Sequence, residues 1–191
     1  DSLRSRGLGD VYKRQKKILR YLQGTRDTHL FIPKEGDLSD LTAWSDAGFA
    51  GINSKSQTGI LLMWGGSIIL WRSSRQTVSA LCTAEAELVA AALCWQILQG
   101  FKILLEEWGF IFDHVNLRVD NTAAITIAEN GGSWRTRYFA VRGSRMNEEI
   151  ASGGLMLAHE PTGKMLADGM TKLGTSDMLL NVRNAMLGVL P

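Results

Sequence analysis

The chain has 191 residues, of which 45% are hydrophobic and 21% are charged, and its formal net charge is +2 at pH 7. This length and composition suit one globular domain with a sizeable core, and they exclude wholesale disorder. So small a net charge neither identifies nor excludes a nucleic-acid-binding protein, because such proteins need only a local basic stripe. No apolar run approaches the 18 residues of a membrane span and no signal peptide opens the chain, so we expect a soluble intracellular protein without membrane contacts.

The N-terminal segment is expected to lie outside the main fold. Residues 1–15 resemble a translated sequencing-adapter artefact, although their four Lys and Arg residues also suit an ordinary basic arm. Next, Lys16–Gln23 predicts a short helix that ends at a glycine, and Thr28–Ile32 predicts a short strand that ends at a proline. A polar linker over residues 34–40 then marks the candidate boundary of the main domain.

Three strands and a long helix are predicted next. Leu41–Ala47 predicts the first strand, and residues 59–71 predict two more around Gly65-Gly66, a two-residue turn of the kind that hairpins favour. These strands would form an antiparallel meander. From Thr83 to Trp108 the residue choice changes to Ala, Leu, Glu and Gln at helical spacing, with Thr83 as the expected N-cap and a glycine as the stop.

The rest of the chain alternates between strands and helices. The expected elements are a strand at Val115–Val119, helices at Thr122–Glu129 and Arg135–Ala151, a strand at Leu155–His159, and short helices near Gly163–Thr171 and Ser176–Met186. This order predicts an α/β architecture in which a helix connects the antiparallel meander to parallel strands. Cys82 and Cys94 have a spacing that suits neither a redox pair nor a zinc site, so we expect both to be small buried side chains in a reducing compartment.

Four carboxylates lie far apart in the sequence but in compatible elements: Asp46, Glu87, Asp120 and Asp168. Asp46 projects from the first strand and Asp120 ends the fourth, so the two meet if those strands are neighbours. Glu87 lies on an apolar face of the long helix, where a carboxylate is costly without a partner. Magnesium prefers oxygen ligands, and two such ions about 4 Å apart clamp both oxygens of a phosphodiester displacement. The pattern therefore indicates hydrolysis of a nucleic-acid strand.

Each acid also has an ordinary alternative role. Asp46 could be a turn residue, Asp120-Asn121 could cap the following helix, and Asp168 could lie on a helix surface. We expect Glu85 to be solvated or to cap the long helix. The joint order of the four acids favours the metal site. His159 follows the last strand, where it either assists proton transfer or product release, or has no role.

At the level of whole motifs the chain resembles the ribonuclease H domain at the end of the Pol polyprotein of copia-type LTR retrotransposons. The match runs over about residues 16–173. The blocks that carry it are Trp44-Ser-Asp-Ala-Gly-Phe-Ala-Gly, Ser56-Gln-Thr-Gly, Ser73-Ser-Arg-Gln-Thr, Thr83-Ala-Glu-Ala-Glu-Leu, Val119-Asp-Asn-Thr-Ala-Ala-Ile and Pro161-Thr-Gly-Lys-Met-Leu-Ala-Asp-Gly-Met-Thr-Lys. The resemblance implies an α/β ribonuclease H-like fold, with a five-stranded mixed sheet of three antiparallel strands and then parallel strands, flanked by helices.

The resemblance also implies a function and its parts. The four carboxylates would be the catalytic set that binds two Mg²⁺ ions, with Mn²⁺ as a substitute, to hydrolyse the RNA strand of RNA/DNA hybrids during reverse transcription. Residues 16–40 would be the tail of the reverse transcriptase and a linker, 41–173 the ribonuclease H domain, and 174–191 a helical tail. The expected partners are the hybrid and the reverse transcriptase portion of the same polyprotein, in a cytoplasmic retrotransposon particle.

Several residues are candidates for contact with the hybrid, whose ribose 2′-hydroxyls such enzymes sense through the minor groove. By motif they are Ser73, Arg75, Gln76, Thr83 and Asn121. Residues 133–145 add four arginines, no acids and interleaved aromatics, from which we select Trp134, Arg135, Arg142 and Arg145. The alternative for this segment is a solvated cationic face.

Two departures from the family pattern keep a second function open. The family usually has an acidic residue where Gly48 stands, and a Lys/Arg-His-Ile-Asp/Glu run where this chain has Arg137-Tyr-Phe-Ala. The alternative is a catalytically silent module, from a decayed copy, that binds or tethers the hybrid. A third hypothesis, a general α/β protein whose acids are surface groups, predicts no magnesium affinity.

Overall fold

A computed structural model describes residues 2–50, 54–130, 137–172 and 176–187, and the chain divides into two compact units, 1–30 and 31–191. In the first unit α1 (Ser2–Gly24) is a single helix. It is longer than the helix predicted at Lys16–Gln23, because residues 2–15 contain no proline and include several good helix formers.

The predicted strand at Thr28–Ile32 is wrong, because this segment forms no regular element. Its apolar residues suit a strand, but no neighbouring strand pairs with it. The backbone N–H of Phe31 donates instead to the carbonyl oxygen of Met186 at 2.8 Å.

The second unit is built on a mixed sheet of five strands, which confirms the predicted fold class. In spatial order they are β3 (Ser67–Arg75), β2 (Gln57–Trp64), β1 (Leu41–Gly48), β4 (Val115–Val119) and β5 (Leu155–His159). The first three are antiparallel, whereas β1, β4 and β5 run parallel to one another. The connection from the meander to β4 therefore needs a crossover, which a long helix supplies.

The turn of the hairpin between β2 and β3 lies at Gly65-Gly66, as predicted. Gly65 and Gly66 have φ of 55° and 79°, values that L side chains rarely adopt. Two consecutive residues with positive φ give a turn whose twist matches the flanking strands. Trp64 and Ser67 consequently pair directly across the turn.

The long helix α2 (Thr83–Glu107) also forms as predicted, but Thr83 is not its N-cap. Cys82 occupies that position without a side-chain hydrogen bond, and the Glu85 carboxylate accepts from the backbone N–H of Leu81 at 2.7 Å instead. At the other end Gly109, with φ of 91°, donates its N–H to the Glu106 carbonyl oxygen, so a left-handed glycine ends the helix.

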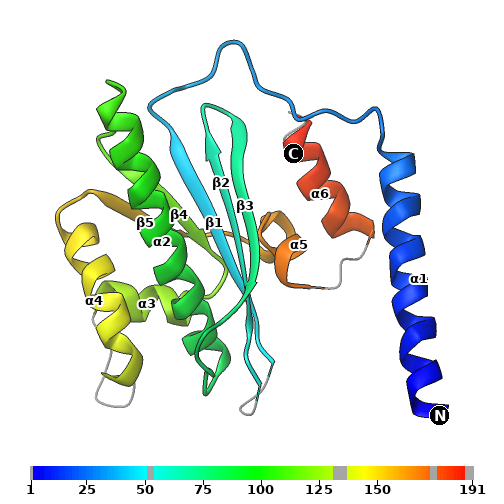
Figure 1. The fold of residues 1–191 in the computed structure, drawn as a ribbon. Coiled ribbons are helices and arrows are strands. Elements are labelled where there is room, and N and C mark those ends of the chain that lie inside the picture. The colour runs from blue at the N-terminus through cyan, green and yellow to red at the C-terminus, as the bar shows by residue number, and fades with distance from the viewer. Residues whose placement is uncertain (1, 51–53, 131–136, 173–175, 188–191) are drawn as a thin grey trace. The chain divides into compact units, whose positions relative to one another are not determined.

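Helices cover both faces of the sheet (Figure 1). One face carries α2, α3 (Thr122–Asn130) and α4 (Arg137–Ala151), and the other carries α5 (Asp168–Thr171) and α6 (Ser176–Met186). The larger core lies under α2 and includes Leu41, Ile60, Leu88, Leu98 and Leu117. The smaller core includes Leu61, Met63, Ile68, Leu166 and Val182. Each such side chain stabilises the fold by about 2 kcal/mol through removal of apolar surface from water.

The helix predicted near Gly163–Thr171 forms in two pieces. A single 3₁₀ turn, η1 (Thr162–Lys164), is followed by the one-turn helix α5. Met165 between them is extended, and its side chain is buried. This break allows a buried side chain to anchor the segment, while α5 turns its own residues toward the sheet.

Two expectations about α2 and the cysteines need correction. Cys94 is buried as expected, but Cys82 is exposed because it precedes the helix. Contrary to the expectation that no segment is long enough, α2 is long and apolar enough to cross a membrane by length and composition alone. In this structure α2 packs against the sheet and buries nine of its residues.

Candidate active site

Two neighbouring parallel strands bring the first two carboxylates together. Ser45 of β1 lies opposite Val119 of β4, so Asp46 and Asp120 follow at the same edge of the sheet. Asp46 is buried and Asp120 is half-buried. Because Asp46 stands within a strand, the alternative that it is a turn residue is wrong. Asn121, rather than Asp120, caps α3, since its Oδ1 accepts from the backbone N–H of Ala124 at 3.0 Å.

Asp168 reaches the same place from the other face of the sheet. It is the first residue of α5 and only 4% exposed, so it is not a surface residue. One carboxylate oxygen of each of Asp46, Asp120 and Asp168 lies within 4.8 Å of the others. The helix can approach this closely because Gly59 of β2 has no side chain. A Cβ there would lie 2.7 Å from the Ala167 carbonyl oxygen.

Glu87 closes the site from α2. Its side chain is 7% exposed and accepts a hydrogen bond from the backbone N–H of Ala47, while Oε2 has no partner among the residues described. Burial, together with the negative charges of Asp46 and Asp120, raises the pKa of Glu87 to about 9. Glu87 therefore holds a proton at neutral pH when no metal ion is bound. We call Asp46, Glu87, Asp120 and Asp168 the carboxylate cluster.

Burial also raises the pKa values of two aspartates in the cluster. For Asp46 a hydrogen bond from Thr171 and the charge of Lys172 oppose this shift. For Asp120 the charge of Asp168 adds to it, and Lys172 again opposes it. A divalent cation would relieve the same cost, because it compensates several buried negative charges at once. The oxygen donors and the unpaired Glu87 oxygen therefore fit a hard cation such as Mg²⁺.

Sequence reasoning assigned no role to two residues that contact the cluster. Thr171 Oγ1 donates to Asp46 Oδ2, and Lys172 Nζ donates to Asp168 Oδ1 at 2.6 Å. Burial lowers the pKa of Lys172, but the hydrogen bond to Asp168 and the nearby negative charges outweigh this and raise the pKa overall. The spacing of four residues from Asp168 to Lys172 is the signal that was available, since such pairs meet on one helix face.

His159 lies beside the cluster but does not touch its carboxylates. Its Nε2 is 3.1 Å from the backbone oxygen of Asp120. A carbonyl oxygen only accepts, so Nε2 carries the proton in this contact. This hydrogen bond places the exposed ring behind Asp120, and its role in proton transfer or product release stays a prediction.

Three of the residues that were predicted to contact the hybrid make hydrogen bonds within the protein. Ser73 Oγ donates to the Met170 carbonyl oxygen at 2.5 Å and so ties α5 to β3. Gln76 is 5% exposed, and its Nε2 donates to Thr58 Oγ1 and to the Ala86 carbonyl oxygen. Asn121 caps α3, as described above. These residues support the site from within, and whether they also contact a nucleic acid stays a prediction.

The other predicted contact residues are not part of the carboxylate cluster. Arg75, Thr83 and Arg145 are exposed on β3, α2 and α4. Trp134 and Arg135 lie outside the described residues, and so does the side chain of Arg142. Their predicted contacts with the hybrid stay untested.

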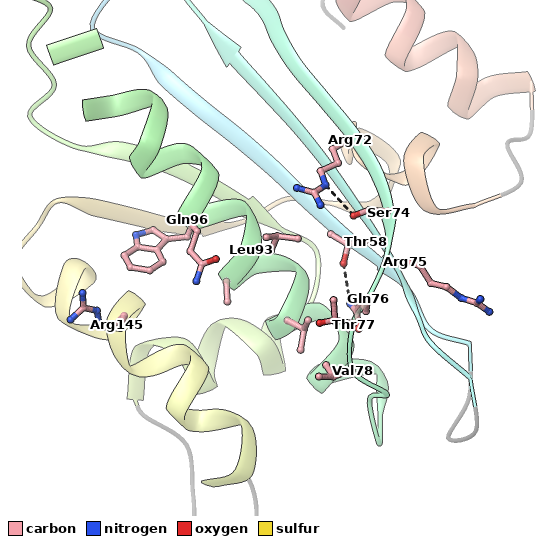
Figure 2. Close-up of a pocket in the computed structure, with 13 residues that line it drawn as sticks. Thr58, Arg72, Ser74, Arg75, Gln76, Thr77, Val78, Leu93, Gln96 and Arg145 are labelled. Atoms are coloured by element: carbon pink, nitrogen blue, oxygen red, sulfur yellow. Dashed lines mark hydrogen bonds between the residues drawn. The ribbon is translucent and has the colours of Figure 1, made fainter. Parts of the chain in front are cut away.

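A pocket of about 460 Å³ lies on the α2 face, between the edge strand β3 and helices α2 and α4. Its lining includes Arg72, Arg75 and Arg145 and no acidic residue. Figure 2 shows Arg72 over the sheet, where its Nε donates to Ser74 Oγ at 3.1 Å, whereas Arg75 points away from α2. We call this feature the arginine-lined pocket. Positive side chains without competing acids suit a phosphate backbone.

Comparison with solved structures defines the class of fold. Ribonuclease H1 from the archaeon Halobacterium salinarum matches with a TM-score of 0.52 at 17% identity, over 69% of this chain and 93% of that one. LC11 ribonuclease H1 in complex with an RNA/DNA hybrid matches with a TM-score of 0.53 at 14% identity, over 69% and 93%. The chain therefore has the ribonuclease H fold.

Sequence comparison then identifies the relatives. The chain is 32% identical to the Retrovirus-related Pol polyprotein from transposon RE2 of Arabidopsis thaliana over 85% of its length, and 32% identical to that from transposon TNT 1-94 of Nicotiana tabacum over 83%. It spans 11% and 12% of those two polyproteins. No protein-family model matches the chain. The chain is thus homologous to a segment of retrotransposon Pol polyproteins, which confirms the resemblance found in its motifs.

Proposed function

We propose that this chain is a metal-dependent endonuclease that hydrolyses the RNA strand of RNA/DNA hybrids during reverse transcription of a retrotransposon. The observation that carries the proposal is the convergence of the carboxylate cluster, in which three aspartate oxygens lie within 4.8 Å of one another. Carboxylates from separate elements that meet at one edge of a sheet are expensive to bury, and a function in metal binding accounts for that cost.

Each residue of the cluster has a role in this proposal. Asp46, Asp120 and Asp168 would hold two Mg²⁺ ions, or Mn²⁺ in their place, and Glu87 would bind from α2 after loss of its proton. The bound cations would supply positive charge at the attacking and leaving oxygens of the phosphodiester. Thr171 would keep the Asp46 carboxylate in one orientation, because its hydroxyl donates to Asp46 Oδ2.

The substrate follows from the surroundings of the cluster. The arginine-lined pocket offers positive charge to a phosphate backbone, and a protein with the same fold has been solved in complex with an RNA/DNA hybrid. The relatives are Pol polyproteins, so we further propose that the reverse transcriptase portion of such a polyprotein is the partner. The cytoplasmic retrotransposon particle is the proposed place of action.

The test is cleavage of an end-labelled RNA/DNA hybrid in the presence of Mg²⁺, beside the same RNA as a single strand. We expect the chain to cut only the hybrid, and Asp120→Asn to abolish the cutting. Asp113→Asn is the matched control, since Asp113 precedes β4 where Asp120 follows it, and its side chain is exposed. This control should cut as the unchanged chain does.

One result would favour the second function. The departures at Gly48 and Arg137 already separate this chain from the family pattern, and a Cβ at Gly48 would lie 3.1 Å from the Thr171 carbonyl oxygen, so α5 now fills that space. If the folded chain binds the hybrid and cuts nothing in Mg²⁺ or Mn²⁺, it is a silent hybrid-binding module, and the catalytic proposal is wrong.

A further inference from the structure

A positively charged side chain already lies against the carboxylate cluster. Lys172 directly follows α5, and its Nζ is 2.6 Å from Asp168 Oδ1. The lysine side chain is 41% exposed and the aspartate side chain 5% exposed, so one end of this ion pair faces solvent and the other is buried. The other ion pairs among the described residues, Arg26–Asp27 and Lys102–Glu106, do not involve the cluster.

The charge of Lys172 acts on more than its direct partner. It also favours the ionised forms of Asp46, Asp120 and Glu87, the remaining members of the cluster. Carboxylate oxygens of three aspartates lie within 4.8 Å of one another, and Lys172 places one positive charge against them. A single monovalent cation therefore balances the negative charge of the cluster only in part, so a divalent cation is still attracted to it.

A cation that binds Asp168 must share that carboxylate with Lys172 or displace it. The exposed end of the lysine gives it a path to solvent, since its flexible stem can swing away without moving the backbone. Asp168 has no such freedom, because α5 is held by the Ser73 hydrogen bond to Met170 and by the fit against Gly59.

We propose that Lys172 is a built-in counter-cation of the carboxylate cluster, which holds Asp168 in place in the ion-free protein and competes with divalent cations for that carboxylate. This inference rests on the proposed metal-binding role of the cluster. It makes Lys172 a positioning residue whose removal strengthens metal binding and weakens the ion-free fold. A residue that merely packs against α5 would not change the two properties in opposite directions.

The experiment measures Mg²⁺ affinity by isothermal titration calorimetry, and thermal unfolding in EDTA, without any nucleic acid. We expect Lys172→Met to bind Mg²⁺ about tenfold more tightly than the unchanged chain, as the loss of one partly exposed competing charge would give. In EDTA the same variant should unfold about 3 °C lower. Lys172→Arg keeps the charge and should restore the lower affinity, and Lys164→Met, which removes an exposed lysine from η1, should behave as the unchanged chain.

Two readouts separate this inference from the proposed function. Tighter Mg²⁺ binding by a folded Lys172→Met supports the counter-cation whether or not the chain cuts hybrids. Equal or weaker binding by that variant overturns it, even if the unchanged chain is an active nuclease. An unchanged chain that binds no Mg²⁺ overturns both.

A measurement on the unchanged chain covers the case in which Lys172→Met does not fold. Mg²⁺ titration should shift the NMR signals of the Lys172 ε-methylene group, while those of Lys164 stay in place. Unshifted Lys172 signals at saturating Mg²⁺ would contradict the competition.

Discussion

The carboxylate cluster and the arginine-lined pocket use charge in opposite ways. The acids of the cluster are buried or half-buried and come from four separate parts of the chain, and hydrogen bonds from Thr171 and Lys172 hold two of them, Asp46 and Asp168. The arginines of the pocket are exposed and long, and they reach the surface from β3 and α4. A metal site requires donor atoms at fixed separations, so its charges must be buried in a rigid frame. A surface for a phosphate backbone requires only positive potential, so its charges can stay solvated.

This difference predicts how strongly the loss of one side chain affects each region. Under the proposed function, loss of one acid would remove a metal ligand that no other group replaces, so the effect should be close to all-or-none. Loss of one arginine removes one of several similar contacts, so the effect should be graded and sensitive to salt. The four predictions below test this contrast, from the largest expected effect to the smallest.

The sharpest test is Asp46→Asn. We expect hybrid cleavage to fall by about 10³-fold or more, which corresponds to about 4 kcal/mol of transition-state stabilisation. In EDTA the same variant should be no less stable than the unchanged chain, because burial raises the pKa of Asp46 and ionisation therefore costs free energy there. Cleavage assays and urea unfolding measure the two effects, with Asp113→Asn as the control. An Asp46→Asn variant that cuts at the original rate would refute the metal-ligand role.

Gly59→Ala tests the close packing of α5 against β2. The new methyl group would lie within 2.8 Å of atoms of Ala167, Met170 and Thr171, so α5 must move away from β2 and carry Asp168 with it. We expect a loss of about 2 kcal/mol in the free energy of unfolding and weaker Mg²⁺ binding. Gly100→Ala in α2 is the control, because its Cβ would meet nothing within 4 Å, and it should stabilise the chain slightly. Unchanged Mg²⁺ affinity in Gly59→Ala would show that α5 tolerates the displacement.

The protonation of Glu87 gives a pH test. Its pKa is about 9 in the folded chain, against about 4.5 for an unfolded glutamate. Below pH 4.5 both states hold the proton. Between pH 4.5 and 9 only the unfolded state releases it, so the ion-free fold loses stability as pH rises through this window. We expect Glu87→Gln to flatten this dependence and to be about 2 kcal/mol more stable at pH 8 in EDTA.

Chemical unfolding at several pH values measures this effect, with the exposed Glu148→Gln as the control. The raised pKa values of Asp46 and Asp120 add a slope nearer to the acidic end, which Glu87→Gln leaves in place. An equally steep slope in Glu87→Gln across pH 6 to 9 would mean that Glu87 is already ionised.

The smallest effect is expected in the arginine-lined pocket. The double variant Arg72→Ala, Arg145→Ala should bind the hybrid about tenfold more weakly at low salt, and the salt dependence of binding should fall by about two charges. Cleavage at saturating hybrid should change little. Fluorescence anisotropy across a salt series measures the binding, with Lys34→Ala, Arg183→Ala as a charge-matched control. Equal losses in both double variants would show that net charge, rather than this pocket, attracts the hybrid.

The sequence alone determined most of the regular elements. The strands β1 to β5, the Gly65-Gly66 turn and the bounds of α2 lie within a few residues of their predicted places, because local periodicity, turn glycines and helix stops are read from neighbouring residues. The sequence also identified all four acids of the carboxylate cluster, since each stands in a recognisable motif. It placed Asp46 and Asp120 together only on the condition that β1 and β4 are neighbours.

Tertiary structure decided the rest. Whether Thr28–Ile32 becomes a strand depends on a pairing partner, and no strand among the described residues pairs with it. Which residue caps α2 depends on the path of the preceding loop: Cys82 takes the position expected for Thr83, and the Glu85 carboxylate accepts from the backbone N–H of Leu81 in that loop. Such outcomes depend on contacts between distant residues, which no local pattern encodes.

The same reason explains why Thr171 and Lys172 were missed. Thr171 meets Asp46, and the local pair of Lys172 with Asp168 reaches the cluster, because α5 packs against Gly59 on a strand more than a hundred residues earlier in the chain. Sequence pattern fixes the chemistry that each residue can offer. Only the tertiary fold decides which of these residues meet. Burial and electrostatic pairing depend on distances in space, and separation along the sequence does not give those distances.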